Sequence, residues 1–309
     1  MRKIKISNSL NAIGLGKIIV GLGNFDGLHL GHQHVLQRVI DEAKELNATP
    51  VCLTFDPHPL QVLKAGKNPF LIMNFDQKIE VLEKMGFRNV CVIPFDENLS
   101  QWSEKKFIEK VLLEDSDLLK VVVGFNFHFG KGRQGTVAFL QKMLNEQGIE
   151  VIEVEPFKKE GKVTSSSYIR EMIKKGDVEK AATFLSRPVR LSGKVVRGSS
   201  RGNMMGFPTA NIDIEGDIFS PTGVYLVSTL YKNKVCYGVM NMGRRPTFDA
   251  SQVDICEVHL FDIKDTLYDV HLDVDVLKKL RDEKKFSSKD DLIEQIKEDC
   301  QKARKLIPR

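Results

Sequence analysis

The 309-residue sequence has no long hydrophobic run and no apolar leader segment. Its longest apolar stretches, such as residues 121–123, fall far short of the roughly 20 residues that a membrane-spanning helix needs. The charged start MRKIKISNSL is not followed by the apolar core and small-residue cleavage site of a signal peptide. We therefore expect neither membrane insertion nor export, and we predict a cytoplasmic location.

Closely spaced cysteines are also missing. The five cysteines are widely separated and mostly embedded in apolar runs, and no Cys-x-x-Cys pair occurs. This usage is typical of small buried side chains in a reducing compartment. The net charge of +5 arises from basic residues that are interleaved with acidic ones along the whole chain. A mild basic excess suits nucleic acid and anionic nucleotides alike, so charge alone does not decide between them.

The first part of the chain alternates apolar, β-branched runs with amphipathic segments. Near-continuous apolar runs are typical of strands that are covered on both faces. We expect strands at residues 17–22, 50–55, 89–93, 119–123 and 149–154, and helices at residues 34–46, 77–85, 104–113 and 136–147. Regular alternation of strand and helix predicts a parallel sheet wrapped by helices. In such sheets, ligands bind at the carboxyl ends of the strands, where loops lead into helices.

The pattern changes after a helical stretch that ends near Leu185. The segment SRPVRLSG breaks the alternation, and about six short extended runs follow, including residues 193–196, 224–230, 235–240, 255–261 and 270–276. Their spacing indicates an antiparallel barrel or sandwich. Ser287 with Asp290 resembles a capping box, so we expect one C-terminal helix to close this domain. The predicted domain boundary lies between residues 186 and 187.

Residues 17–36, KIIVGLGNFDGLHLGHQHVL, join a buried strand through a glycine-rich turn to a helix. The glycines allow close approach of a ligand, and a helix N-terminus favours phosphate. His29 and His32 fall on one side of the first helical turn, where they could stabilise the charge of a leaving pyrophosphate. Tight packing with solvated histidines is the alternative. A zinc site of His29, His32 and His34 is disfavoured, because no thiolate or carboxylate stands at ligand spacing.

The four residues His29-Leu30-Gly31-His32 resemble the His-x-Gly-His motif of the nucleotidyltransferase superfamily, whose members transfer AMP from ATP to an acceptor. The longer string GNFDGLHLGH is similar to the adenylyltransferase module of bacterial bifunctional riboflavin kinase/FAD synthetases. Three further segments match that family in order: TFDPHP at residues 54–59, VGFNFHFGKGRQG at 123–135 and TSSSYIREMIKKG at 164–176. The resemblance implies a Rossmann-like nucleotidyltransferase domain with a parallel sheet over residues 1–186.

The resemblance also implies roles for individual residues of this domain. The residues that it assigns to ATP are Gly23, Asn24, Phe25, Asp26, His29, Gly31 and His32, with the two histidines acting in catalysis. A second phosphate clamp would consist of Ser165, Ser166, Ser167 and the catalytic Arg170, since hydroxyls and a guanidinium suit a triphosphate. A serine cluster of this kind is otherwise often only a helix cap. Asn126 would hold the flavin, with Phe127 and Phe129 offering aromatic faces, although both aromatic residues could equally belong to the core.

A second polar group lies in the stretch MGFPTANI. Thr209 and Asn211 are two apart in an extended segment stiffened by Pro208, so both side chains project to one face. Their oxygens suit a Mg²⁺ that keeps water and nucleotide phosphates as its other ligands, although such residues are commonly only turn or edge residues. The segments that resemble the riboflavin kinase module of the same family, in order, are GKVVRGSSRGNMMGFPTANI, PTGVYLV, GVMNMGRRPTF, EVHLFD and LRDEKKF. The resemblance implies an antiparallel β-barrel riboflavin kinase domain over residues 187–309.

Within this module, the resemblance makes Glu257 of EVHLFD the general base for the riboflavin 5′-hydroxyl. Arg281 and Phe286 would close over the flavin ring. The glycine-rich stretch would cover the phosphates of ATP through backbone amides, and its candidate nucleotide contacts are Gly193, Lys194, Gly198, Gly206 and Pro208. Three residues, Asn203, Met205 and Asp269, depart from those common in relatives, and the kinase is expected to be active but slower than usual.

The leading hypothesis is a bifunctional enzyme that phosphorylates riboflavin to FMN and adenylylates FMN to FAD, using MgATP in both steps. Its partners are then the small molecules ATP, riboflavin, FMN and FAD, with neither nucleic acid nor membrane, and the protein is a monomer or weak homo-oligomer. Two alternatives stay open: a monofunctional FAD synthetase with a vestigial kinase module, and a flavin-sensing regulator that binds RNA. The regulator is disfavoured because the basic residues form no aromatic-interleaved patch.

Overall fold

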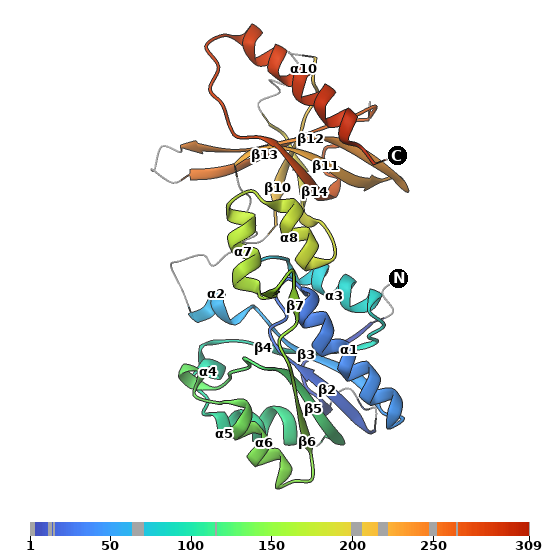
Figure 1. The fold of residues 1–309 in the computed structure, drawn as a ribbon, viewed down its shortest axis with the longest axis vertical. Coiled ribbons are helices and arrows are strands. Elements are labelled where there is room, and N and C mark those ends of the chain that lie inside the picture. The colour runs from blue at the N-terminus through green and yellow to red at the C-terminus, as the bar shows by residue number, and fades with distance from the viewer. Residues whose placement is uncertain are drawn as a thin grey trace. The chain divides into compact units, whose positions relative to one another are not determined.

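The computed structural model describes residues 4–11, 14, 16–63, 71–114, 116–198, 206–215, 222–246, 252–263 and 265–308. The chain forms two compact units (Figure 1). The first comprises Met1–Pro69 and Phe75–Ser165, and the second comprises Phe70–Asn74 and Ser166–Arg309. Within the described residues, no helix combines the length and the apolarity that crossing a bilayer requires.

The first unit is built on a parallel sheet with the strand order β1-β4-β3-β2-β5-β6. Its strands are β1 (Lys5–Ser7), β2 (Ile18–Leu22), β3 (Thr49–Asp56), β4 (Asn89–Pro94), β5 (Leu118–Gly124) and β6 (Glu150–Val154). All five predicted strands are present, and β2 is buried along its whole length, as expected of a strand covered on both faces. Strand β1 was not predicted, because it is short, lies at the sheet edge and is largely exposed.

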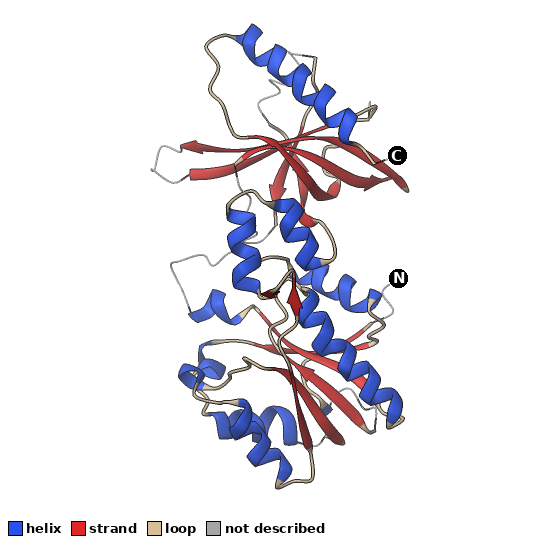
Figure 2. Cartoon of the chain, in the orientation of Figure 1, coloured by secondary structure: helices blue, strands red, loops and turns tan. Residues whose placement is uncertain are grey.

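Helices cover both faces of this sheet (Figures 1 and 2). They are α1 (Leu30–Glu45), α2 (Pro59–Leu63), α3 (Phe75–Lys84), α4 (Glu97–Ser100), α5 (Glu104–Phe107), which continues as the π-helix η2 (Ile108–Leu113), the 3₁₀ turn η3 (Lys131–Arg133) and α6 (Val137–Asn145). A small hairpin, β7 (Lys158–Lys159) with β8 (Lys162–Val163), follows β6. The four predicted helices are confirmed, although α1 begins at Leu30 rather than at residue 34, because His29 caps it.

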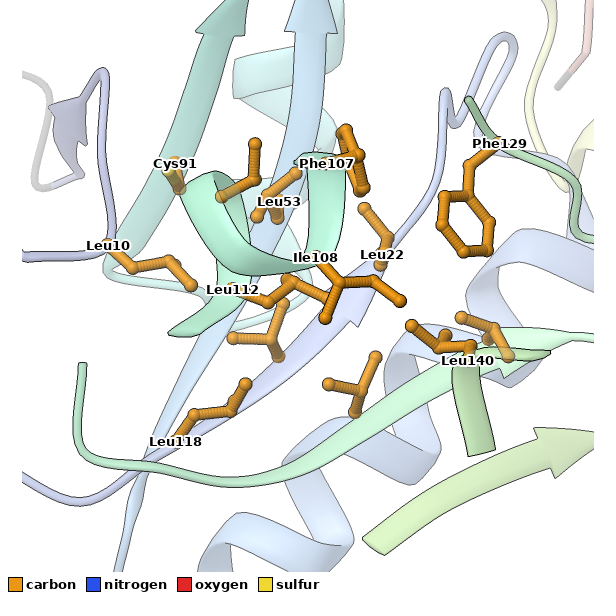
Figure 3. Close-up of a cluster of buried hydrophobic side chains, with 14 of the residues drawn as sticks. Leu10, Leu22, Leu53, Cys91, Phe107, Ile108, Leu112, Leu118, Phe129 and Leu140 are labelled. Atoms are coloured by element: carbon orange, nitrogen blue, oxygen red, sulfur yellow. The ribbon is translucent and has the colours of Figure 1, made fainter. Parts of the chain in front are cut away.

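The core of the first unit lies between the sheet and the helices α5, η2 and α6. Figure 3 shows Leu22 and Leu53 of the sheet close to Phe107 and Leu140 of these helices. On the opposite face, α1 packs directly on β2. A Cβ at Gly21 would lie only 2.8 Å from Cγ2 of Val39, so a glycine is required for this close approach.

The strand order reverses next to β2. The chain runs from β2 outward through β3 and β4, and then returns to place β5 on the other side of β2. Loops that leave the carboxyl ends of two such strands diverge, and the crevice between them is where open α/β sheets bind ligands. The segments GNFDGLHLGH and GFNFHFG follow β2 and β5, so both lie at this switch point.

The second unit contains two helices, α7 (Ser166–Lys174) and α8 (Val178–Leu185), followed by a closed barrel and a C-terminal helix, α10 (Lys289–Leu306). The barrel strands, all paired antiparallel, are β9 (Val189–Val196), β10 (Ala210–Ile214), β11 (Gly223–Tyr231), β12 (Lys234–Pro246), β13 (Gln252–Leu260) and β14 (His271–Arg281). The barrel that the family resemblance implies is therefore confirmed, whereas the strand spacing alone left a sandwich open.

The interior of the barrel is filled by alternate residues of its strands, including Ile212, Tyr225 and Val258. The outer face of β11 is covered by α10, whose Cys300 and Ala303 pack against Val224 and Leu226. This helix confirms the predicted closure of the domain.

The predicted cap of the C-terminal helix is wrong by one residue. Ser288 is the N-cap, and its Oγ accepts a hydrogen bond from the backbone N–H of Asp291 at 3.0 Å. Ser287 instead donates its hydroxyl to the Asp291 carboxylate at 2.9 Å. Each of the two adjacent serines is followed three residues later by an aspartate, so the sequence does not distinguish them as caps. The backbone of Ser288 is extended and places its hydroxyl at the first turn of α10.

The contacts group α7 and α8 with the barrel. Ile169 and Phe184 share a buried cluster with Val189 of β9, and Glu179 pairs with Lys278 of β14 at 2.8 Å. Ile72, from the inserted segment Phe70–Asn74, joins the same cluster. A division by contacts need not coincide with a division by function, so the domain boundary after residue 186 stays a prediction.

Candidate active sites

The turn between β2 and α1 holds the first group of predicted site residues. Phe25 and Asp26 are each 3% exposed and His29 is 4% exposed, whereas Asn24 is open to solvent. Phe25 and Leu28 have positive φ angles of 49° and 38°, which non-glycine residues adopt rarely. Such backbone conformations persist only where the surroundings hold them, and they are concentrated at functional sites.

The two predicted histidines lie against each other at the start of α1. The rings of His29 and His32 stack with their centroids 3.6 Å apart and an angle of 16° between their planes. Nδ1 of His29 accepts a hydrogen bond from the backbone N–H of His32 at 3.2 Å. Because Nδ1 is the acceptor, the neutral ring of His29 carries its proton on Nε2. That N–H, beside the positive end of a helix, suits an anionic group.

Glycines shape this turn from within. A Cβ at Gly23 would lie 3.0 Å from the ring of Phe25, and that ring in turn meets His32 edge-on at 5.4 Å. A Cβ at Gly31 would lie 3.2 Å from both the His29 ring and the backbone oxygen of Thr164. Gly31 therefore lets the start of the TSSS segment approach the first turn of α1.

Behind the turn lies a buried lysine that the sequence analysis missed. Lys78 of α3 is 6% exposed, and its Nζ donates to the backbone oxygen of Asn24 at 2.9 Å and to Oγ1 of Thr54 at 3.3 Å. Burial lowers the pKa of Lys78, and the carboxylates of Asp26 and Asp56 oppose that shift. Partial burial raises the pKa of Asp56. A lysine within an amphipathic helical pattern gives no local signal that it will be buried.

The loop that follows β5 carries the predicted flavin residues. Asn126 is exposed, and Phe127 is half-buried and stacks on Phe129 at 5.5 Å between centroids. Phe129 is 7% exposed and belongs to the core, so the core interpretation holds for this ring. A Cβ at Gly135 would come within 2.8 Å of the Phe129 ring. Phe127 is thus a partly exposed aromatic face supported from below by Phe129.

The predicted phosphate clamp begins at the end of the first unit. Ser165 is the last residue of that unit, and Ser166, Ser167 and Arg170 lie on α7 of the second unit. Ser167 is exposed, whereas Ser165, Ser166 and Arg170 are half-buried.

In the barrel, Glu257 of β13 lies between two asparagines. It is directly opposite Asn211 of β10 on one side and Asn241 of β12 on the other. Its neighbours Cys256 and Val258 are 2% and 1% exposed and fill the barrel interior, so Glu257 faces outward. Directly opposite residues of antiparallel strands have Cβ atoms about 4.5–5.5 Å apart. The three side chains therefore form one polar row on the outer surface.

Asn241 is the residue of this row that the sequence analysis did not identify. It lies inside the quoted string GVMNMGRRPTF, but only the pairing of β12 with β13 brings it beside Glu257. Thr209, the predicted partner of Asn211, immediately precedes β10 and is half-buried. Among the residues that the structure describes, no group of three His, Cys, Asp or Glu side chains is arranged to hold a metal ion.

The glycine-rich stretch contacts this row at Gly198. A Cβ at Gly198 would lie 2.2 Å from Nδ2 of Asn211, so only glycine allows the two residues to lie so close. Gly193 has a different role, because its Cβ would lie 2.0 Å from the backbone oxygen of Asp213 on the paired strand β10. Gly206 has a φ of 82° with open space around its Cβ position. Asn203 and Met205 lie outside the described residues.

Two further predicted nucleotide contacts, Lys194 and Pro208, are held by neighbouring side chains. Lys194 pairs with Asp269 at 2.7 Å, and this hydrogen bond lowers the pKa of Asp269. Asp269 has a φ of 64°, a left-handed backbone conformation that glycine adopts without strain. The backbone oxygen of Pro208 accepts a hydrogen bond from Nδ1 of His259 at 2.8 Å, which ties the segment before Thr209 to β13.

Arg281 is engaged with α10. Its Nε and Nη2 donate to the carboxylate of Asp299 at 3.0 and 2.8 Å, and Asp299 is 4% exposed. The guanidinium carbon also lies 5.8 Å from the centroid of the Phe286 ring. Phe286 lines a hollow of about 290 Å³ between the loop at residues 284–287 and α10. A direct flavin contact by Arg281 stays a prediction.

Comparison with known proteins gives concordant results for the two parts of the chain. A family model described as FAD synthetase matches residues 14–168, and one described as riboflavin kinase matches residues 185–307. The bifunctional riboflavin kinase/FMN adenylyltransferase of Bacillus subtilis (strain 168) is 36% identical over 291 residues, covering 93% of this chain and 92% of the relative. The same enzyme of Escherichia coli (strain K12) is 32% identical over 308 residues, covering 99% and 98%.

A crystal structure from Streptococcus pneumoniae, described as a macrolide-efflux protein, superposes with a TM-score of 0.86 at 27% identity and covers 99% of this chain and 100% of that one. It shows the same overall fold.

The fold, the two polar centres and the matched models define a two-module enzyme of flavin nucleotide synthesis. The chain belongs to the family of bifunctional riboflavin kinase/FMN adenylyltransferases, which convert riboflavin to FMN and FMN to FAD. The family, the fold class and the pair of enzyme activities predicted from the sequence are confirmed.

Proposed function

We propose that ATP is the donor in both steps and that the steps occur at two separate centres, one at the β2–α1 turn and one on the outer face of the barrel. The observation that carries the proposal is the stacked pair of His29 and His32 at the N-terminus of α1, located where the strand order reverses. A helix N-terminus at a switch point is suited to bind a nucleotide phosphate chain.

At the first centre, a phosphate oxygen of FMN attacks the α-phosphorus of ATP, and pyrophosphate leaves. The ring N–H groups of His29 and His32 and the amides of the first turn of α1 stabilise the charge that develops on the phosphates. Asn24, Asp26 and Ser165 contribute further contacts to ATP. Ser166, Ser167 and Arg170 stay predicted phosphate contacts, since hydroxyls and a guanidinium suit a triphosphate. Asn126 and the exposed face of Phe127 hold the flavin, because an aromatic ring stacks well on a planar ring system.

At the second centre, the 5′-hydroxyl of riboflavin attacks the γ-phosphorus of ATP, and ADP leaves. Glu257 accepts the hydroxyl proton, while the flanking side-chain amides of Asn211 and Asn241 orient its carboxylate. Hard oxygen donors at Thr209 and Asn211 fit a Mg²⁺ ion, which supplies charge neutralisation for the transferring phosphoryl group when bound. The backbone amide of Gly198, which lies against Asn211, contributes a contact to the phosphates.

The direct test is to incubate the protein with riboflavin, ATP and Mg²⁺ and to separate the flavins and the adenine nucleotides over time. We expect FMN with ADP first, then FAD with pyrophosphate, and neither flavin product after omission of ATP or chelation of Mg²⁺. If FAD forms from added FMN and ATP but no FMN forms from riboflavin, the proposal is limited to the first centre. Turnover that persists without ATP or Mg²⁺ would overturn the assignment of donor and metal.

The cellular setting belongs to the same proposal. The five cysteines are all free thiols, which supports a reducing compartment such as the cytoplasm. We propose that the enzyme works there on small-molecule substrates, as a monomer or a weak homo-oligomer, and sedimentation of the purified chain tests its oligomeric state.

A further inference from the structure

The ammonium group of Lys78 lies beneath the turn that joins β2 to α1. It reaches the turn from α3 and donates to the backbone oxygen of Asn24 at 2.9 Å. Thr54, which is 0% exposed, donates its hydroxyl to the same oxygen at 3.1 Å. A lysine is almost never this deeply buried unless it is paired, because removing a charge from water is costly. The arrangement therefore indicates a specific use of the buried charge.

The charge of Lys78 is balanced locally. The carboxylates of Asp26 and Asp56 attract it, and Asp26 belongs to the same turn as Asn24. Its hydrogen bonds thus go to a carbonyl of the turn and a hydroxyl of β3, and two carboxylates of the same segments attract its charge. None of these groups belongs to the helix that carries Lys78, so the lysine connects α3 to the carboxyl ends of β2 and β3.

The oxygen that Lys78 and Thr54 hold belongs to the peptide between Asn24 and Phe25. That peptide precedes the positive φ of Phe25, which is 49°. The conformation is unfavourable for a phenylalanine and needs external support. Phe25 places its ring edge against His32, whose ring stacks on His29. A continuous series of contacts therefore runs from Lys78 through Asn24 and Phe25 to the histidine pair.

We propose that Lys78 is a positioning residue of the adenylyltransferase centre, which holds the Asn24–Phe25 peptide so that the Phe25 ring aligns the His29–His32 pair. The inference rests on the proposed location of that centre at the β2–α1 turn. Lys78 need not touch ATP or flavin, because it acts through the backbone of the turn. Its removal therefore affects the rate of adenylyl transfer more than the binding of FMN.

The test uses the full-length chain with the substitution Lys78→Met, which removes the charge and keeps an unbranched side chain. Starting from FMN and MgATP, we expect kcat for FAD formation to fall by about tenfold or more, with KM for FMN changed by less than about threefold. Formation of FMN from riboflavin is expected to remain unchanged. In proton–carbon NMR spectra, the Cε1–H signal of His32 is expected to shift, because its neighbouring rings move.

Lys84→Met is the matched control. Lys84 lies on the same helix but is exposed and pairs only with Glu80, at 2.6 Å, within the described contacts. It is expected to leave kcat and the His32 signal unchanged. Thr54→Val removes the second donor to Asn24 and is expected to lower kcat in the same direction. The double variant Lys78→Met with Thr54→Val should fall short of the product of the two single effects, because both residues hold one oxygen.

Each outcome has a defined meaning. A folded Lys78→Met protein with unchanged kcat and an unchanged His32 signal would overturn the inference. If Lys78→Met does not fold, Thr54→Val decides, and an unchanged kcat in that variant overturns it. Unimpaired FAD formation by His29→Ala would instead show that the adenylyltransferase centre lies elsewhere. If His29→Ala loses FAD formation and Lys78→Met does not, only the role of Lys78 is rejected.

Discussion

Glu257 lies directly opposite Asn211 across the pair of strands β10 and β13. The two residues are 46 positions apart in the sequence, as their numbers 257 and 211 give, and the register of the barrel brings them together with Asn241. A half-buried carboxylate flanked by two amides on the outer face of the barrel can accept a proton while the amides orient it. The geometry thus turns three separate sequence motifs into one candidate catalytic row.

Glu257→Gln is expected to reduce FMN formation from riboflavin by about 10²- to 10⁴-fold, since an amide cannot accept the hydroxyl proton. FAD formation from added FMN should stay near that of the unchanged protein. Initial rates of both steps, followed by chromatography of the flavins, check this. Glu215→Gln is a suitable control, because Glu215 is exposed and contacts His271 at 3.2 Å. Retention of most kinase activity in Glu257→Gln would contradict the role of Glu257.

His29→Ala is expected to have the reverse selectivity. Loss of one preorganised donor beside the developing pyrophosphate charge should lower FAD formation about 10²- to 10³-fold and spare FMN formation. His34→Ala, an exposed histidine on the same helix, should have little effect on either step. If His29→Ala reduced both steps equally in a folded protein, the assignment of one step to each centre would be wrong.

Gly198→Ala tests the link between the glycine-rich stretch and the barrel row. The added Cβ would have to occupy a point 2.2 Å from Nδ2 of Asn211, so one of the two must move. We expect a large rise in KM for MgATP in the kinase step and a higher Mg²⁺ requirement, without any change in FAD formation from FMN. Asn211→Ala should produce a similar defect, and the double variant should be little worse than either single one. A normal Mg²⁺ requirement in Gly198→Ala would contradict the proposed ligand role of Asn211.

Glu42 should make the stability of the first unit depend on pH. It is 5% exposed and pairs with Lys120 at 2.7 Å and with Arg38 at 2.6 Å. The hydrogen bond from Lys120 lowers the pKa of Glu42 below its ordinary value of 4.5. A carboxyl whose pKa is lower in the folded state stabilises the protein above its unfolded pKa, and this stabilisation is lost as the pH falls through the folded pKa.

Glu42→Gln should therefore lower the unfolding free energy at pH 7 by about 1–3 kcal/mol, and the difference from the unchanged protein should shrink below about pH 4. Trp102, the single tryptophan, lies in the first unit, so its fluorescence reports unfolding there. Glu150→Gln removes the exposed partner of Lys120, at 2.8 Å, and should have a smaller effect. An equal loss of stability at pH 7 and pH 3 in Glu42→Gln would contradict this account.

The sequence alone predicted the elements whose pattern is local. Strands such as β2 are buried on both faces, so their composition is continuously apolar and reveals them without knowledge of their neighbours. The exposed edge strand β1 has no such pattern, and it becomes a strand only because β4 lies beside it. The helix cap at Ser288 rather than Ser287 was likewise not determined by the local sequence pattern.

The sequence by itself determined the family, the two kinds of domain and the motifs in which most candidate site residues lie, because these depend on residue order along the chain. Only the tertiary structure placed Asn241 beside Glu257 and buried Lys78 beneath the turn. The physical reason is that strand register and helix docking depend on contacts between residues far apart in the chain, and such contacts leave no periodic or local signal in either partner.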